Sequence, residues 1–101
     1  MTNLEKWVYF CTQVYGCVVC RRGNTPVVEP IFTHGEYHHM LKNGRRMGEF
    51  FGFGLCPTHH RSHTKRIVGR NQNQRKFEAA YGLEADMLKE VQRAFKETPN
   101  G

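Results

Sequence analysis

Apolar side chains near the start of the chain recur every three or four positions, which is the spacing of one face of an α-helix. They are Leu4, Trp7, Val8, Cys11, Val14 and Tyr15. Thr2 and Glu5 stand before this set with the spacing of a capping box, and Gly16 follows it. The pattern predicts a helix that begins after Thr2 and ends at Gly16.

The middle of the chain carries two short stretches that are typical of strands. They are residues 36–41 and residues 50–55, the second of which is rich in aromatic side chains, and the glycine-containing segment 42–48 between them predicts a loop. Pro57 suits the first position of a helix, which we expect to continue over residues 58–68. The predicted order is therefore strand, loop, strand and helix.

The last quarter of the chain predicts two helices. A short one runs from Arg75 to Tyr81 and stops at Gly82, and an amphipathic pattern after it predicts the second. The apolar face of this second helix consists of Leu83, Met87, Leu88, Val91 and Phe95. Helix packing explains these residues without any chemistry. Further upstream, residues 24–26 predict a turn and residues 27–32 an extended stretch.

Two ligand pairs stand at the spacing of a zinc site. Cys17 and Cys20 form a Cys-x-x-Cys pair. Cys56 and His59 form a Cys-x-x-His pair. Such a set of thiolates and imidazole is the one that structural zinc prefers. The four residues could instead be unrelated core positions, but paired spacing at both ends favours zinc. Cys11 stands outside the series, and we expect it at a buried apolar position of the first helix.

The remaining histidines are numerous enough for a second metal ion that does chemistry. His38 and His39 stand in the first predicted strand, and His60 and His63 stand in the helix after the second strand. Adjacent strand residues point to opposite faces, so one of the first pair should face a metal while the other faces water or the core. The two helix histidines can converge on one ion. A second structural zinc site built from these four is the alternative. His34 has no partner at motif spacing and fits an ordinary loop position.

The positive charge gathers around these histidines. Residues 41–76 carry nine Lys and Arg side chains against one Glu, whereas residues 1–40 are balanced and residues 77–101 carry a net −2. Such a segment attracts the phosphates of a polyanion, because neutralised phosphates release their counterions. The alternative is a solvated face that only keeps the protein soluble, but the position beside candidate metal ligands favours nucleic acid.

Composition gives further information on the class of protein and on its cellular compartment. Hydrophobic residues make up 39% of the chain and charged residues 24%, as in a globular protein. No apolar run approaches the roughly 18 residues of a membrane span, and the start of the chain lacks a signal-peptide pattern. We therefore expect a cytoplasmic protein with no membrane partner. Cysteines at this spacing in a reducing compartment indicate metal binding rather than disulfides.

Four motifs follow one another along the chain. They are Gly16-Cys17-x-x-Cys20, Glu36-Tyr37-His38-His39-Met40, Gly44-Arg45-Arg46-Met47-Gly48 and Gly54-Leu55-Cys56-Pro57-x-His59-His60-Arg61. Together with the later segment 77–88, they resemble the phage Ref-type nucleases, the RecA-dependent branch of the HNH endonucleases. The resemblance covers about residues 7–95. It implies a ββα-metal finger with a structural zinc beside it, which cuts DNA with a divalent ion.

The resemblance also implies roles for single residues. It places His39 at the general-base position of the first strand, His38 at a metal-binding position and His60 at the helix ligand. His63 is a further candidate for the same ion. The middle Asn of the HNH pattern is absent, and residues 48–51 (Gly-Glu-Phe-Phe) occupy its stretch, so Glu49 or a backbone carbonyl would orient the base. The reverse assignment, with His38 as the base, stays open.

The sequence thus predicts one HNH-type, zinc-containing nuclease domain over residues 1–101. Its expected fold is α+β, with a zinc-stapled ββα-metal (HNH or His-Me finger) core and flanking N- and C-terminal helices. We expect a metal-dependent DNA endonuclease of phage recombination or DNA processing, acting in the cytoplasm of a bacterial host with DNA and a RecA-type recombinase as partners. Its cofactors would be a structural Zn²⁺ and a catalytic Mg²⁺, Mn²⁺ or Zn²⁺.

Phosphate contacts, which position a protein on DNA without reading sequence, are expected from the basic side chains of this region. These are Lys42, Arg45, Arg46, Arg61, Lys65, Arg66 and Arg70. The alternative function is a non-catalytic zinc module that binds DNA or a recombination protein. The absent Asn favours this alternative, and the histidines without a structural role oppose it.

Overall fold

The computed structural model describes residues 1–21, 35–61, 69–71 and 73–97. The predicted turn at 24–26 and the extended stretch at 27–32 lie outside these ranges. The part of the predicted helix beyond Arg61 that covers residues 62–68 also lies outside them. The described residues form a small α+β fold.

The first helix forms as the sequence predicts. α1 (Asn3–Tyr9) starts at a capping box, in which the Glu5 amide donates to Thr2 Oγ1 at 3.0 Å and the Thr2 amide donates to Glu5 Oε1 at 2.8 Å. The helix continues into a π-helical segment, η1 (Phe10–Val14). It ends at Gly16, whose positive φ of 75° glycine adopts without steric cost.

The central sheet consists of two antiparallel strands, β1 (Glu36–His39) and β4 (Gly52–Leu55). His38 is paired with Phe53 in the register, and side chains paired in this way lie on the same face of the sheet. Tyr37 therefore points to the other face. Both predicted strands are present, although each is shorter than the predicted stretch.

The η1 segment packs directly on β4. A Cβ atom added at Gly54 would meet the carbonyl oxygens of Cys11 and Gly16, so no larger residue fits at this position. This close approach fixes the end of the first helix against the sheet. It also brings the residues that follow Gly16 next to the end of β4.

The segment between β1 and β4 contains a hairpin, and the predicted loop over 42–48 was wrong in this respect. β2 (Leu41–Lys42) pairs with β3 (Arg45–Arg46) in a separate two-stranded sheet. Asn43 and Gly44 connect them with positive φ angles of 54° and 78°. Two consecutive positive φ angles are the mark of a type I′ turn, for which Asn-Gly is the preferred sequence.

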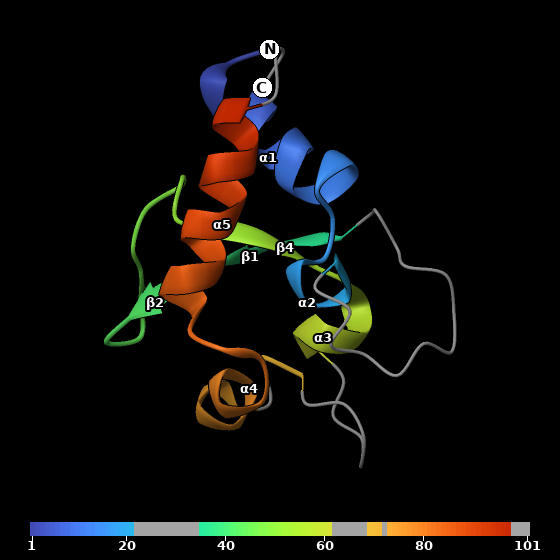
Figure 1. Ribbon diagram of the computed structural model, residues 1–101. Helices are drawn as coiled ribbons and strands as arrows, with labels where there is room; N and C mark the ends of the chain where they lie inside the picture. The colour runs from blue at the N-terminus through green and yellow to red at the C-terminus, as the bar shows by residue number, and fades with distance from the viewer. Residues whose placement is uncertain (22–34, 62–68, 72, 98–101) are drawn as a thin grey trace.

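The described residues form four further helices beside the sheet. α2 (Val18–Arg21) and α3 (Pro57–Arg61) are short, and α4 (Gln74–Tyr81) and α5 (Glu84–Glu97) follow the predicted pattern closely. α5 lies across the β1–β4 pair, α4 lies beside the start of α5, and α2 and α3 lie next to each other (Figure 1). No helix in the described ranges is both long and apolar enough to cross a membrane.

One core joins these elements. Its largest fully buried apolar side chains are Phe53, Phe77, Leu55, Met87, Val18, Val19 and Val91. The rings of Trp7 and Phe10 each pack edge-on against Phe95, at centroid distances of 5.2 and 5.1 Å. The core therefore connects the first helix, β4 and the two C-terminal helices.

Candidate metal centre

Four side chains from different parts of the chain meet between α2 and α3. Cys17 directly precedes α2, Cys20 lies in α2, Cys56 follows β4 directly, and His59 lies in α3. Their potential ligand atoms all lie within 4.8 Å of one another, and none of the four residues is more than 8% exposed. Among the residues that the structure describes, this is the only group of three or more side chains suited to a metal ion.

The spacing of the ligand atoms fits zinc. The Cys20 and Cys56 sulfurs are 3.8 Å apart, and the three sulfurs lie 3.6, 3.5 and 3.2 Å from Nδ1 of His59. Tetrahedral zinc, with bonds of about 2.3 Å to sulfur and about 2.0 Å to nitrogen, separates two sulfurs by about 3.8 Å and sulfur from nitrogen by about 3.5 Å. The four residues could therefore hold one structural zinc ion, as the sequence predicts.

Electrostatics also favour a cation at this cluster. Hydrogen bonds from Cys17 and Cys20 lower the pKa of the Cys56 thiol well below its usual range, and contacts with Cys20 and Cys56 raise the pKa of Cys17. Burial lowers the pKa of His59, but hydrogen bonds to Cys20 and Cys56 and the charge of Cys56 outweigh this effect and raise the pKa to about 9. The crowded thiols thus compete for protons, and a metal ion would replace those protons and allow all three sulfurs to be thiolates.

Cys11 is not part of the cluster. It is fully buried in η1, which confirms the expected apolar position on the first helix. Burial raises the pKa of its thiol, so it stays protonated.

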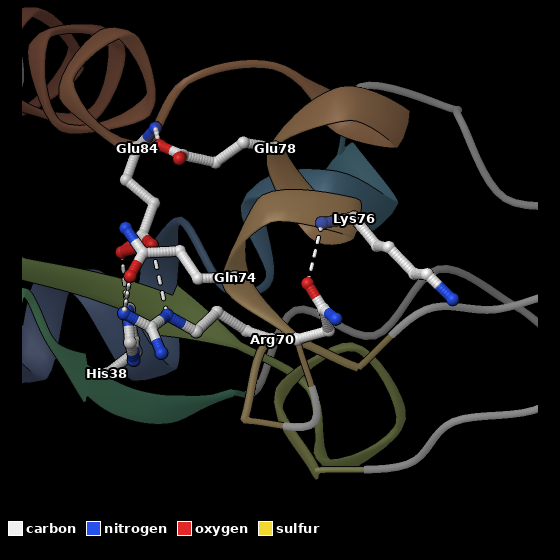
Figure 2. Close-up of polar contacts among 7 residues, drawn as sticks. His38, Arg70, Gln74, Lys76, Glu78 and Glu84 are labelled. Carbon is white, nitrogen blue, oxygen red and sulfur yellow. Dashed lines mark hydrogen bonds and ion pairs between the residues drawn. The ribbon is translucent and has the colours of Figure 1, made fainter.

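A second polar group surrounds His38, which is only 3% exposed. Nε2 of His38 lies 2.7 Å from Oε1 of Glu84, the first residue of α5. Arg70 donates from Nε to the other carboxylate oxygen of Glu84 at 3.0 Å and from a terminal nitrogen to Gln74 Oε1 at 2.9 Å. Figure 2 shows the carboxylate of Glu84 above the ring of His38, with the guanidinium of Arg70 beside that ring. A buried hydrogen bond between His38 and Glu84 thus connects β1 to α5, and Arg70 forms an ion pair with the same carboxylate.

The charges of this group support each other. Burial would raise the pKa of Glu84, but the hydrogen bond and charge of His38 and the nearby Arg70 outweigh it and hold the pKa below its usual range. Burial lowers the pKa of His38 despite the hydrogen bond to Glu84. At neutral pH, the arrangement is therefore a neutral imidazole, an ionised carboxylate and a guanidinium.

His60 of α3 faces His38 across a short gap. The two ring centroids are 5.2 Å apart and the rings are nearly perpendicular. Nδ1 of His60 lies 2.8 Å from Oε1 of Glu36, whose second oxygen lies 2.7 Å from Arg61. Both histidines therefore have one ring nitrogen bonded to a carboxylate.

These bonds determine which ring nitrogens remain available. A carboxylate accepts hydrogen bonds and donates none, so the bonded nitrogens, Nε2 of His38 and Nδ1 of His60, carry the hydrogens. In the neutral rings, Nδ1 of His38 and Nε2 of His60 then have lone pairs. Within the described ranges, no hydrogen bond engages either of these two atoms. Carboxylates bound to the second nitrogen of an imidazole are the usual environment of metal-ligating histidines.

His39 lies on the opposite face of β1. Its ring packs edge-on against Tyr37 at 5.0 Å, and its Nε2 comes within 4.0 Å of Glu49 Oε2, which is longer than a hydrogen bond. Tyr37 in turn receives a hydrogen bond from Trp7 and donates one to the Glu49 carbonyl. About a quarter of the His39 side chain is exposed, so water reaches it, in contrast to His38.

The basic residues expected at phosphates fall into separate environments. Lys42, Arg45 and Arg46 are exposed on the β2–β3 hairpin. Arg61 is exposed and paired with Glu36.

The structure corrects the expectation that Arg70 contacts a phosphate. Its side chain is only 8% exposed and is paired with Glu84, so it supports the interior instead of the surface. Lys65, Arg66 and His63, like His34, lie outside the described residues.

Sequence reasoning missed both carboxylates of this region. Glu36 stands two residues before His38 in a strand, and the period of two places both on one face, so alternation could have identified it. Glu84 follows His38 by 46 positions and sits in a helix that packing alone explained. No spacing in the sequence connects those two residues.

Comparisons of this chain with models of known protein families, with curated proteins and with solved structures find no match.

Proposed function

We propose that this protein is a metal-dependent DNA endonuclease of the HNH type, in which the zinc cluster holds a ββα-metal core. The observation that carries the proposal is the facing pair of His38 on β1 and His60 on α3. Each ring has one nitrogen bonded to a carboxylate and a second nitrogen with a lone pair. The order β1, hairpin, β4 and α3 is the strand, loop, strand and helix order of the finger that the sequence resembles.

His38 and His60 would hold a divalent ion, with His63 as a further ligand. Such an ion neutralises the charge that grows on the leaving oxygen when a phosphodiester is cleaved. His39, the more accessible of the adjacent histidines, would take the proton from the attacking water. The attacking and leaving oxygens stand roughly in line on opposite sides of phosphorus. A base at His39 and an ion at His38, on opposite faces of β1, are therefore compatible with this reaction.

Among the described residues, the carboxylate within 4.0 Å of His39 is that of Glu49, in the stretch where the HNH pattern has its middle Asn. Glu49 would orient the His39 ring in place of the absent Asn. This role requires the two side chains to approach each other to hydrogen-bond distance when substrate binds. The exposed side chains of Lys42, Arg45 and Arg46 would contact DNA phosphates. Phage recombination, with a RecA-type recombinase as partner, is the setting that the resemblance suggests.

A plasmid-nicking assay with Mg²⁺ or Mn²⁺ tests this function. His39→Ala should reduce cleavage by about 10²- to 10⁴-fold, because it removes a general base, while zinc content, folding and DNA binding remain. His60→Ala should also raise the concentration of ion needed, so that excess Mn²⁺ restores part of the activity. Gln92→Ala, an exposed change on α5, serves as a control that is purified in parallel.

The outcome of the assay also decides between assignments. Wild-type cleavage by His39→Ala together with an inactive His38→Ala would show that His38 is the base. Absence of cleavage by the wild-type protein with every ion would contradict the endonuclease.

A non-catalytic zinc module that binds DNA or a recombination protein is the second candidate. The observation that favours it is the position of His39, on the opposite face of β1 from His38 and His60. Retained DNA binding by a wild-type protein that does not cleave would support this module.

A further inference from the structure

We infer that Glu84, held by Arg70, is a positioning residue that makes His38 a metal ligand through Nδ1. The inference rests on the proposed function, because it concerns the ion that His38 and His60 would hold. It assigns a role in the site to the C-terminal helix α5, of which packing explains only the apolar face.

The first step is the choice of tautomer. A neutral histidine carries its hydrogen on one ring nitrogen, and its hydrogen-bond partners decide which one. Glu84 offers only an acceptor to Nε2 of His38, at 2.7 Å. The hydrogen is therefore on Nε2, and Nδ1 has the lone pair that a metal ion requires. A residue that can donate as well as accept would not make this choice.

The second step is the fixed orientation of Glu84 itself. Its backbone amide donates to Glu78 Oε2 at 2.9 Å, and Arg70 bonds its second carboxylate oxygen. Arg70 is anchored in turn, because its amide donates to the carbonyl of His59 at 2.7 Å and its guanidinium bonds Gln74. The carboxylate thus has contacts on both of its oxygens, and Figure 2 shows it above His38 and close to Gln74, the first residue of α4.

The third step is the position of the ring. Phe53 packs edge-on against His38 at 5.3 Å, and His60 does so at 5.2 Å. With Nε2 bonded to Glu84, rotation of the imidazole would break a buried hydrogen bond. Ring packing alone would fix the plane of the imidazole but not the nitrogen that carries the hydrogen. The carboxylate is thus what distinguishes a metal ligand from a packed histidine at this position.

Two measurements on zinc-saturated protein without a histidine tag test the inference. The ring ¹⁵N chemical shifts of His38 report its tautomer directly, and Ni²⁺ titration calorimetry reports the second metal site, since imidazole suits this ion. His38→Ala defines the Ni²⁺ binding that depends on His38. We expect the Nε2–H tautomer in the wild-type protein and His38-dependent binding of Ni²⁺.

Glu84→Gln keeps the size of the side chain, but an amide can donate or accept and does not specify the tautomer. We expect a mixed tautomer and Ni²⁺ affinity about 10- to 100-fold lower, the usual effect of losing such a carboxylate. Asp86→Asn, the same charge change at an exposed position of the same helical turn, should bind Ni²⁺ as the wild-type protein does.

Wild-type Ni²⁺ affinity in a folded Glu84→Gln protein would overturn the inference. An Nδ1–H tautomer of His38 in the wild-type protein would also overturn the inference. So would Ni²⁺ binding that is the same in His38→Ala as in the wild-type protein. A protein that binds Ni²⁺ in this Glu84-dependent way but leaves DNA intact would contradict the endonuclease and not the role of Glu84. The two failures are therefore distinguishable.

Discussion

His38 and His39 are neighbours in the sequence, yet the alternation of β1 gives them different chemistry. His38 points into the protein, where it is 3% exposed and bonded to a carboxylate. His39 points to the other face, where water reaches its ring. The sequence could predict that the two differ, since adjacent strand residues face opposite ways. It could not predict which one is buried, because that depends on the position of α5.

The buried His38 should make stability depend on pH. Its folded pKa is lower than its ordinary value of 6.5, so the unfolded chain binds more protons below that pH. Stability is then fully present above about pH 6.5 and is lost as the pH falls through the folded pKa. The paired Glu84, also with a lowered pKa, adds a loss in the same direction at more acidic pH, below its ordinary 4.5.

Urea unfolding of zinc-loaded protein between pH 7.5 and 5 would measure the slope. The matched control is His38→Gln, whose amide can still donate to Glu84 but does not titrate. We expect the wild-type protein to lose more stability than the variant as the pH falls. Parallel slopes would mean that His38 titrates as it does in the unfolded chain.

At the scale of elements, the sequence predicted the helices better than the middle of the chain. The capping box, Gly16 and the apolar face of α5 are local signals, and each predicted helix that the structure describes is present. The sequence does not predict the β2–β3 hairpin as long as its glycines are interpreted only as loop signals, although Asn43-Gly44 specifies a type I′ turn.

The candidate site was predicted only where spacing carries the information. The ligand pairs around Cys17 and Cys56 are local motifs, and the fold brings them together as expected. The bond from His38 to Glu84 joins residues 46 positions apart, and the burial of Arg70 follows from that bond. Basic residues in one stretch of sequence look alike, but the fold places some at the surface and one inside.

The exposed hairpin should carry DNA affinity without sequence preference. Arg45→Gln combined with Arg46→Gln should reduce the salt dependence of DNA binding by a slope of about two, one for each lost phosphate contact. Binding to unrelated DNA sequences should weaken uniformly. Titration of a labelled duplex at several salt concentrations measures both effects.

Lys89→Gln combined with Arg93→Gln removes the same charge from an exposed part of α5. This control should change the salt slope much less, because only net charge is altered. Equal slopes for the two double variants would show that the hairpin arginines face solvent without contacting phosphates.

At the scale of the whole molecule, the cluster of Cys17, Cys20, Cys56 and His59, which could hold zinc, connects parts that are distant in sequence. Cys17 and Cys20 follow the first helix, whereas Cys56 and His59 belong to the end of β4 and to α3. A chain of this size has a small core, and a structural metal is a common additional source of stability. The cluster also fixes α3, which carries His60, so the candidate site depends on it.

Cys20→Ser should therefore lose zinc and much of the folded structure. The substitution replaces one of four ligands with a poor one, and binding of structural zinc contributes about 10–16 kcal/mol in small zinc domains, where it is coupled to folding.

Cys11→Ser is the matched control, since Cys11 is equally buried but outside the cluster. It should keep one zinc ion per chain and lose only about 1–3 kcal/mol, the cost of burying a hydroxyl group. Zinc content by mass spectrometry and thermal unfolding by circular dichroism, each with and without a chelator, distinguish the two variants. Unchanged zinc content and an unchanged melting temperature in Cys20→Ser would contradict the structural role of zinc at this cluster.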